Sequence, residues 1–339
     1  MHRFSMGAFT LFDFNPHKQT ENKMSSKKIS RVVALLASVA LLSGVTTAPS
    51  QAIPKNDTQT LVSTEWLAKN INDPKVVVLE VSAEEGLYER GHITGAIKVS
   101  WTKELVDPVN RNILSQKSFQ NLARKAGIDN DSTVVFYGDN NNWFAAWGAW
   151  VFNIYGLNDV RLLDGGRIKW EKDGRPLTTA VSTPALGNVV AKKADASIRA
   201  FLPEVLNVAK KKTNNALVDI RSADEFSGKI FAAPGFQELA IRARHIPGAI
   251  NIPWKTAINA DGTFKKTAEV RKIYADLGID GKKPIIVYCR IGERASHTWF
   301  LLSQVLGYNV KVYDGSWTEY GNSVGVPISN PAGTVWGVA

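Results

Sequence analysis

Cysteine is nearly absent from this 339-residue chain, in which Cys289 is the single example. One cysteine excludes an intrachain disulfide framework. The five histidines, two of which lie in the first 52 residues, show no metal-ligand spacing, so we expect no metal site. The lone thiol is therefore either a buried apolar side chain or a reactive group.

The chain also lacks an apolar run at its N-terminus long enough to span a bilayer, which takes about 20 residues. The run there, Val32–Val45, has 14 residues, follows four Lys/Arg between residues 23 and 31, and precedes small residues ending at Ala52. This order is typical of a secretory signal peptide, so we predict a leader over residues 1–52 and export to the periplasm or extracellular space. An uncleaved anchor is the alternative; after cleavage we expect no stable membrane insertion. Translation starts at either Met1 or Met24, which directly precedes the basic stretch.

A concentrated excess of charge is missing as well. The formal net charge is +10, but the first 52 residues hold six Lys/Arg and two Asp/Glu, which leaves +6 for residues 53–339. These basic residues are spread along the chain, so we expect no nucleic acid partner, although a basic cleft for a small anion remains compatible with the sequence. With 44% apolar and 21% charged residues, the chain can form two ordinary domains, each with its own core.

The chain repeats itself. Residues 91–101 recur as residues 244–254, 134–137 match 285–288, and 162–165 match 312–315, at offsets of 153, 151 and 150 positions. Three landmarks in one order indicate a duplicated domain. We predict a first domain over residues 53–177, a linker over 178–197 that is rich in Thr, Ala, Ser and Lys, and a second domain over 198–339.

Within each copy, short β-branched apolar runs alternate with amphipathic stretches. This alternation predicts an α/β fold in which a mostly parallel sheet is flanked by helices on both faces. In the first copy we expect strands at 76–81, 134–137 and 160–163 and helices near 118–125 and 143–155. In the second copy we expect strands at 217–220, 285–288 and 310–313 and helices near 267–277 and 295–306.

Cys289 directly follows the predicted strand Ile285–Tyr288, at the carboxyl end of a parallel strand, where ligands bind in open α/β sheets. The loop N–H groups and the start of the next helix would place positive potential around the sulfur. Arg290 and Arg294 add two cations in the same loop. We therefore expect a lowered thiol pKa and a thiolate near neutral pH.

The loop Cys289-Arg-Ile-Gly-Glu-Arg294, the two His-Ile-x-Gly-Ala-Ile segments and the two Asp-Gly strand ends resemble the rhodanese superfamily in its tandem form, over roughly residues 60–328. The resemblance implies two tandem rhodanese-like domains, of which the second is catalytic. The first is expected to be silent, since Gly138 or Asp139 stands where the second copy has Cys289. It also implies that Cys289 carries sulfur as a persulfide, from a small anionic donor to cyanide or a thiol, without a cofactor.

The same resemblance implies roles for the loop residues. Those expected to bind substrate are Arg290, Ile291, Gly292, Glu293 and Arg294, and those expected to brace the loop are Asp219 and Arg221, for which a surface ion pair is the alternative. Thiosulfate enzymes of the family resemble Cys-Arg-Lys-Gly here, and mercaptopyruvate enzymes Cys-Gly-Ser-Gly. Arg290 thus favours thiosulfate, although Ile291 replaces the Lys and Glu225 replaces a frequent substrate-binding Arg, for which Arg294 could substitute. We predict a thiosulfate sulfurtransferase; the alternatives are a 3-mercaptopyruvate sulfurtransferase and a non-enzymatic sulfur carrier or binding module.

Three further patterns bear on the site. Phosphatases resemble Cys-x5-Arg, whereas here Arg294 lies one position too early, which argues against dephosphorylation. The helical stripe Trp143, Trp147 and Trp150 predicts either core or interdomain packing or a wall opposite Cys289. His92 and His245 occupy equivalent positions in the two copies, so we expect them to stabilise the fold.

Overall fold

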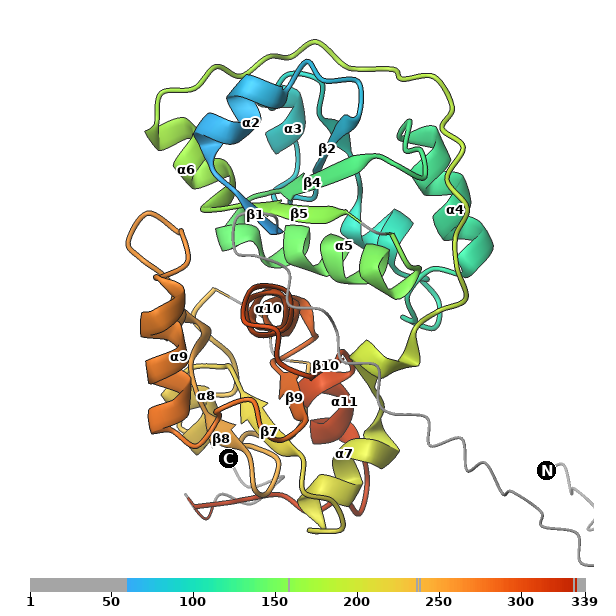
Figure 1. Cartoon of the computed structure of the whole chain (residues 1–339). Helices are drawn as coiled ribbons and strands as arrows, with labels where there is room; N and C mark the ends of the chain where they lie inside the picture. Colours follow the sequence, from blue (N-terminus) through green and yellow to red (C-terminus); the bar gives the residue numbers. More distant parts are fainter. Residues whose placement is uncertain (1–59, 158, 236, 238, 332, 334–339) are drawn as a thin grey trace, which may run out of the picture. The chain divides into compact units, whose positions relative to one another are not determined.

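The computed structural model describes residues 60–157, 159–235, 237, 239–331 and 333 (Figure 1). The predicted leader therefore lies outside the described residues. Within them, the strands form two five-stranded sheets, ordered β1-β5-β4-β2-β3 and β6-β10-β9-β7-β8. Every strand pair in both sheets is parallel. Because the two orders correspond strand for strand, the duplication seen in the sequence is a duplication of topology.

The first copy places helices on both faces of its sheet. Its strands are β1 Leu61–Val62, β2 Val76–Glu80, β3 Ile97–Lys98, β4 Thr133–Tyr137 and β5 Val160–Leu163, and its helices are α2 Thr64–Asn70, α3 Leu87–Arg90, α4 Gln116–Lys125, α5 Trp143–Ile154 and α6 Gly166–Lys172. In Figure 1, α5 runs along one side of β4 and β5, and α2, α3 and α6 lie on the other. The buried residues divide in the same way, since α4 and α5 share one core cluster and α2, α3 and α6 share another.

The second copy repeats this arrangement. Its strands are β6 Arg199–Ala200, β7 Ala216–Asp219, β8 Ile250–Asn251, β9 Ile285–Tyr288 and β10 Val310–Tyr313, and its helices are α7 Leu202–Ala209, α8 Ala223–Ser227, α9 Thr267–Asp276, α10 Glu293–Trp299 and α11 Ser316–Asn322. A π-helical turn, Phe300–Val305, continues α10. Helices α9 and α10 cover one face of the sheet, and α7 and α11 cover the other.

The predicted fold class is confirmed, because both copies are parallel sheets with helices on both faces. The strands expected from β-branched runs appear within one or two residues of their predicted bounds. The helix after Cys289 was expected to start at residue 295 or later, and this was wrong: it begins at Glu293. Gly292 adopts φ 103°, a left-handed conformation that suits glycine, and this tight turn allows the helix to begin immediately.

The segment predicted as the linker is irregular from residue 179 to residue 195. It nevertheless lies against the first copy, because the N–H of Gly187 donates to Arg124 and that of Val189 to Ile128. The side chain of Val189 is buried in the core cluster that contains α4 and α5. The domain boundaries themselves stay a prediction.

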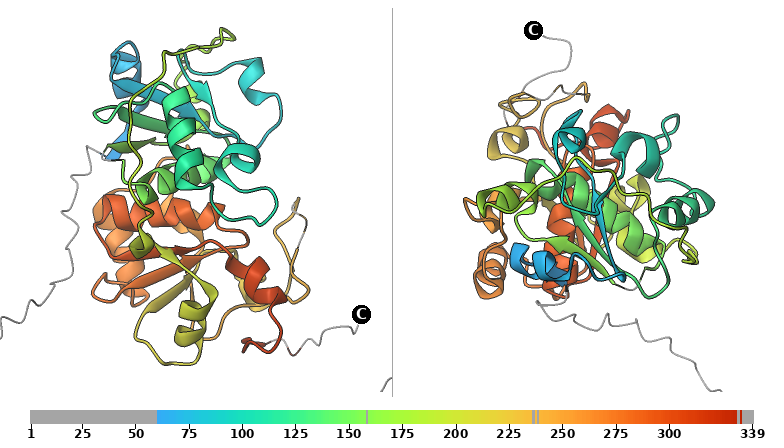
Figure 2. Two further views of the ribbon diagram at one scale, coloured as in Figure 1. Left: turned by 90° about the vertical axis from the view of Figure 1, so that its right-hand side faces the viewer. Right: turned by 90° about the horizontal axis from the view of Figure 1, so that it is seen from above.

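The helices that face each other across the two copies are α5 and α10, which pack together (Figure 2). Their buried residues belong to one continuous apolar cluster that runs from the first sheet to the second. The tryptophan stripe lies on α5, where Trp147 and Trp150 are fully buried. The stripe thus packs between the copies, which was the first of its two predicted roles, and Trp143 also lies under the Arg294 guanidinium of the second copy.

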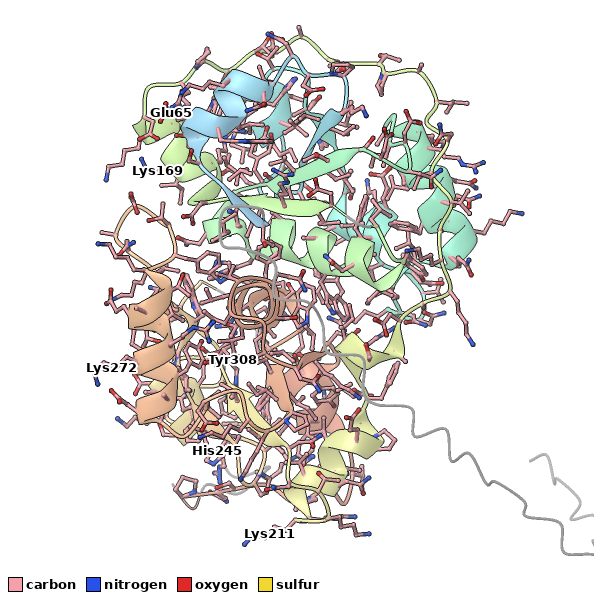
Figure 3. The ribbon with its side chains drawn as sticks, viewed as in Figure 1. Glu65, Lys169, Lys211, His245, Lys272 and Tyr308 are labelled. Atoms are coloured by element: carbon pink, nitrogen blue, oxygen red, sulfur yellow. The ribbon has the colours of Figure 1, made fainter. Side chains whose placement is uncertain are left out.

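The equivalent histidines have equivalent surroundings. The ring of His92 stacks on Tyr88, and its Nδ1 lies 2.9 Å from the Tyr88 carbonyl oxygen. The ring of His245, labelled in Figure 3, stacks on Phe226, and its Nδ1 lies 2.7 Å from the Phe226 carbonyl oxygen. Both residues stabilise the fold, as their repetition predicts.

Candidate active site

Cys289 follows β9, the middle strand of the second sheet, and its side chain is completely buried. The backbone N–H of Gly292 donates to Sγ over 3.0 Å. Only Arg290, Ile291 and Gly292 separate the cysteine from the first residue of α10. The thiol is thus held at the carboxyl end of a parallel strand and the start of a helix, where N–H groups point towards bound anionic atoms.

The first turn of α11 fixes the backbone of this loop. The Cys289 N–H donates to Ser316 Oγ over 3.1 Å, and the N–H groups of Trp317 and Thr318 donate to the carbonyls of Cys289 and Arg290 at 3.0 and 2.9 Å. Ser316 Oγ in turn donates to the Tyr313 carbonyl at the end of β10. Because the polar backbone groups on both sides of the sulfur are satisfied, the loop is preorganised around it.

The Glu293 carboxylate is the charged group that contacts the sulfur. Its Oε2 lies 3.6 Å from Cys289 Sγ, and its side chain is 2% exposed. Burial raises the pKa of Cys289 and Glu293 adds to this, whereas Arg294 and the N–H groups of Ala295 and Gly292 lower it. The expectation of a lowered thiol pKa was therefore wrong, because desolvation and a neighbouring carboxylate outweigh the cation and the helix start.

The two loop arginines already have partners. Arg294 donates to both carboxylate oxygens of Glu225, at 3.1 and 3.2 Å, within a buried ion pair. Burial raises the pKa of Glu225, but Arg294 and the Ser222 N–H outweigh it, so the net pKa is lowered. Arg290 donates to the Gln237 carbonyl over 2.7 Å. Each guanidinium is thus engaged within the protein, and its binding of the donor's anion stays a prediction.

Asp219 and Arg221 form a buried ion pair, so their alternative as a surface pair is excluded. Arg221 Nη2 lies 2.7 Å from Asp219 Oδ2 and also donates to the Arg244 carbonyl. The guanidinium lies over the rings of Tyr288 and Trp317, at 5.8 and 4.9 Å from their centroids. The pair thus packs against Tyr288 and Trp317, the residues directly beside Cys289 and Ser316, and its role in bracing the loop stays a prediction.

The first copy contributes Arg111 to the site, a residue that the sequence did not single out. Its guanidinium donates to the carbonyl of Ile291 and, over 3.1 Å, to that of Asp314. Helix α5 approaches the same loop, since a Cβ added to Gly292 would lie 2.5 Å from Cζ3 of Trp147. The loop that holds Cys289 therefore contacts both copies.

Arg111 has an unusual backbone conformation for its residue type. It adopts φ 58°, and in the matching turn of the second copy this place is taken by Gly262, with φ 82°. The turns match because the bridge Val106–Ile113 corresponds to the bridge Ile258–Phe264. An arginine backbone held in the left-handed region, which glycine usually occupies, carries about 1–3 kcal/mol of conformational strain. Comparing the sequences of the two copies at this turn, where Arg111 stands opposite Gly262, could have pointed to Arg111.

The counterpart of Cys289 in the first copy is Gly138. The hydroxyl of Tyr137 accepts the N–H of Ile93, as the hydroxyl of Tyr288 accepts the N–H of Ile246, so the residues that follow the two tyrosines are equivalent. A Cβ at Gly138 would lie 2.1 Å from the Val81 carbonyl oxygen. The first copy thus has no room for a cysteine here.

Two classes of site are not seen in the part of the chain that the structure describes. There, no group of three or more His, Cys, Asp or Glu side chains could hold a metal ion. Among the same residues, no helix has both the length and the apolarity needed to cross a bilayer.

Comparison with known proteins assigns the family. The model of the rhodanese-like domain matches the chain twice, at residues 63–173 and 202–323. The chain belongs to the rhodanese family. A Saccharopolyspora erythraea protein named "Putative thiosulfate sulfurtransferase" is 53% identical over 275 residues, which cover 80% of this chain and 97% of that protein. "Sulfur carrier protein TtuD" of Thermus thermophilus is 51% identical over 275 residues, or 80% of this chain and 96% of that protein.

Among solved rhodanese structures, SseA from Escherichia coli is similar in both fold and extent. Its title describes the rhodanese fold and catalytic mechanism of 3-mercaptopyruvate sulfotransferases. The TM-score is 0.65 and the sequence identity 28%, over 77% of this chain and 99% of that one. The tandem arrangement predicted from the repeats is therefore that of this rhodanese.

Proposed function

We propose that this chain is a thiosulfate sulfurtransferase in which Cys289 carries the transferred sulfur. The cysteine thiolate attacks the outer sulfur of thiosulfate, the S–S bond of the donor breaks, and sulfite leaves with the electron pair. A thiol or cyanide then attacks the outer sulfur of the persulfide and returns the Cys289 thiolate. The relatives at 51–53% identity whose names specify thiosulfate sulfurtransferase or sulfur carrier support this proposal.

The observation that carries the proposal is the placement of the one cysteine. Cys289 lies at the end of the central strand of the second sheet, and its Sγ accepts a backbone N–H at 3.0 Å. Such N–H groups stabilise the extra charge on a persulfide sulfur, because they point to where the charge develops. The equivalent place in the first copy, Gly138, is closed to any side chain.

The direct test is the persulfide itself. Intact-mass measurement after treatment with thiosulfate should show wild-type protein heavier by one sulfur atom, and cyanide should reverse the change. Cys289→Ser should show neither the mass increase nor turnover, while its far-UV circular dichroism stays that of wild type. Turnover of the Ser variant within tenfold of wild type would overturn the assignment. Loading without turnover on any acceptor would instead indicate a sulfur carrier.

A second donor, 3-mercaptopyruvate, is favoured by one specific observation. Arg294 is paired with the buried Glu225 carboxylate, and Arg290 donates to the Gln237 carbonyl. The positive charge available to a dianionic donor is therefore smaller than the sequence suggests. The likeness to SseA points in the same direction. Following sulfur loading over time by mass, with each donor separately, decides between them. The preferred donor should load wild-type Cys289 with the higher kcat/KM.

We also propose that the mature protein is exported and begins near Ile53. The support is the order of basic, apolar and small residues that ends at Ala52. N-terminal sequencing of the native protein should give Ile53 within a few residues, in the periplasmic or extracellular fraction. Recovery of residues 1–52 in a cytoplasmic fraction would contradict both the cleavage and the export.

A further inference from the structure

We propose that Glu293 is a catalytic residue that takes the proton of the Cys289 thiol while sulfur is bound and returns it when sulfur leaves. The inference rests on the proposed sulfur transfer and names the group that manages its proton. It starts from a geometric fact: the thiol is fully buried and the atom to which it can donate is a carboxylate oxygen at 3.6 Å.

The requirement for an internal acceptor follows from burial. The thiolate is the nucleophile, so the proton must leave Sγ before the donor is attacked. Cys289 is 0% exposed and Glu293 is 2% exposed, so solvent has little access to either group. Burial and the carboxylate together raise the pKa of Cys289, so the attack on the donor requires an acceptor for the thiol proton.

The other charges near the pair are already matched. Helix α5, which packs against α10, carries no ionisable side chain between residues 143 and 154. On the remaining elements the nearby charges have protein partners: Arg294 with Glu225, Asp314 with Arg199, Asp219 with Arg221, and Arg111 with two carbonyl groups. Among the charged groups described, Glu293 accepts a hydrogen bond from Sγ, and Arg294 is the cation that lowers the thiol pKa most.

The proton balance closes over one cycle. The S–H bond of Cys289 breaks, its proton goes to Glu293 Oε2, and its electron pair stays on Sγ. Sγ bonds to the outer sulfur of the donor, and the donor's S–S bond breaks with its pair leaving on sulfite. When cyanide takes the outer sulfur as thiocyanate, the Cys289–sulfur bond breaks with its pair on Sγ, and Glu293 returns the proton. Neither oxidant nor reductant is consumed.

This arrangement makes a specific prediction about pH. In wild type the proton moves within the pair, so the single-turnover rate of sulfur loading should stay nearly constant from pH 7 to 9. In Glu293→Gln the solvent must take the proton from a buried thiol, so the rate should rise about tenfold per pH unit and fall about 10²-fold below wild type at pH 7. Glu293→Asp should keep the flat profile at a reduced rate. Glu269→Gln, which removes an exposed carboxylate on α9, should match wild type.

The measurement is rapid-quench detection of sulfite release from excess thiosulfate, with circular dichroism to confirm that each variant folds. A Gln variant that loads as fast as wild type, or faster, at pH 7 would overturn the inference, because a carboxylate that only repels the thiolate slows loading. A Gln profile parallel to that of wild type would overturn it as well. Failure of wild type itself to load sulfur would instead refute the proposed function, so the two failures are distinguishable.

Discussion

At the level of single residues, the difference between Cys289 of the second copy and Gly138 of the first is a difference in the space for a side chain. The backbone of Gly138 is held on both sides by hydrogen bonds. Its N–H donates to Asn142 Oδ1 over 3.0 Å, and its carbonyl accepts the N–H of Arg167. Its missing side chain faces the Val81 carbonyl. The side chain of a cysteine placed there would collide with the backbone at Val81 and could not contact a substrate.

We therefore predict that Gly138→Ala destabilises the protein while leaving the chemistry of Cys289 in place. The clash of a Cβ with a backbone oxygen should lower the free energy of unfolding by about 1–3 kcal/mol, measured by urea denaturation. Cys289→Ser is the matched control at the equivalent site, and it should abolish sulfur loading with the smaller change in stability. Full stability of the Gly138 variant would show that the first copy could accommodate a side chain after all.

Helix α10 is the element through which the site and the core are joined. All of its residues from Glu293 to Trp299 are buried, so it carries the loop at its start and core packing along its length. The ring of His297 stacks on Phe264 with centroids 4.5 Å apart and meets Trp254 edge-on. Burial lowers the pKa of His297 to about 3, so the ring stays neutral in the folded protein at every pH where the enzyme is expected to work.

The lowered pKa of His297 predicts a loss of stability in acid. Between pH 6.5 and 3 the unfolded chain binds a proton at this position and the folded chain does not, so stability falls as the pH falls. His297→Phe keeps a ring in the same contacts and removes the difference. From pH 7.5 to 5, its free energy of unfolding should gain about 2 kcal/mol relative to wild type. Parallel stability profiles for the two proteins would contradict a buried neutral histidine.

The elements that sequence reasoning placed correctly are those with a strong local pattern. Strands such as Val160–Leu163 and Ile285–Tyr288 are buried on both faces, so their apolar runs identify them. The two-residue edge strands were missed because they are too short to show a period. The early start of α10 was missed because it depends on the left-handed turn at Gly292.

The partners within the site were less predictable, because they depend on packing between distant segments. The two copies form the same buried arginine–carboxylate pair with arginines from different sequence positions. In the second copy Arg221 pairs with Asp219 and reaches the Arg244 carbonyl, whereas in the first copy Arg167 of α6 pairs with Glu80 and reaches the equivalent Gly91 carbonyl. The two buried guanidinium groups thus lie at equivalent places in the two folds, although the arginines are not equivalent in the sequence repeat. A comparison of the repeats cannot show this.

On the scale of the whole described chain, equivalent turns of the two copies each form hydrogen bonds with the other copy. The turn of the first copy, closed by the bridge Val106–Ile113, sends Arg111 to the carbonyl of Asp314 at the end of β10. The turn of the second copy, closed by Ile258–Phe264, donates the Phe264 N–H to the carboxylate of Asp164 at the end of β5, over 2.9 Å. Of these two residues, Arg111 also donates to the Ile291 carbonyl, so the first copy supports the loop of the second copy that carries Cys289.

This contact predicts that Arg111 is a positioning residue whose loss slows the enzyme without unfolding it. Arg111→Gly removes the guanidinium and also relieves the left-handed strain, so the free energy of unfolding should change by less than about 1 kcal/mol. Losing a charged hydrogen bond to the Ile291 carbonyl should cost about 1.5–3 kcal/mol in the ordering of the loop, or roughly one to two decades in kcat, with KM nearly unchanged. Arg111→Lys should restore part of the rate, because an ammonium can still donate to one carbonyl. If the glycine variant were instead less stable and fully active, Arg111 would serve only to join the two copies.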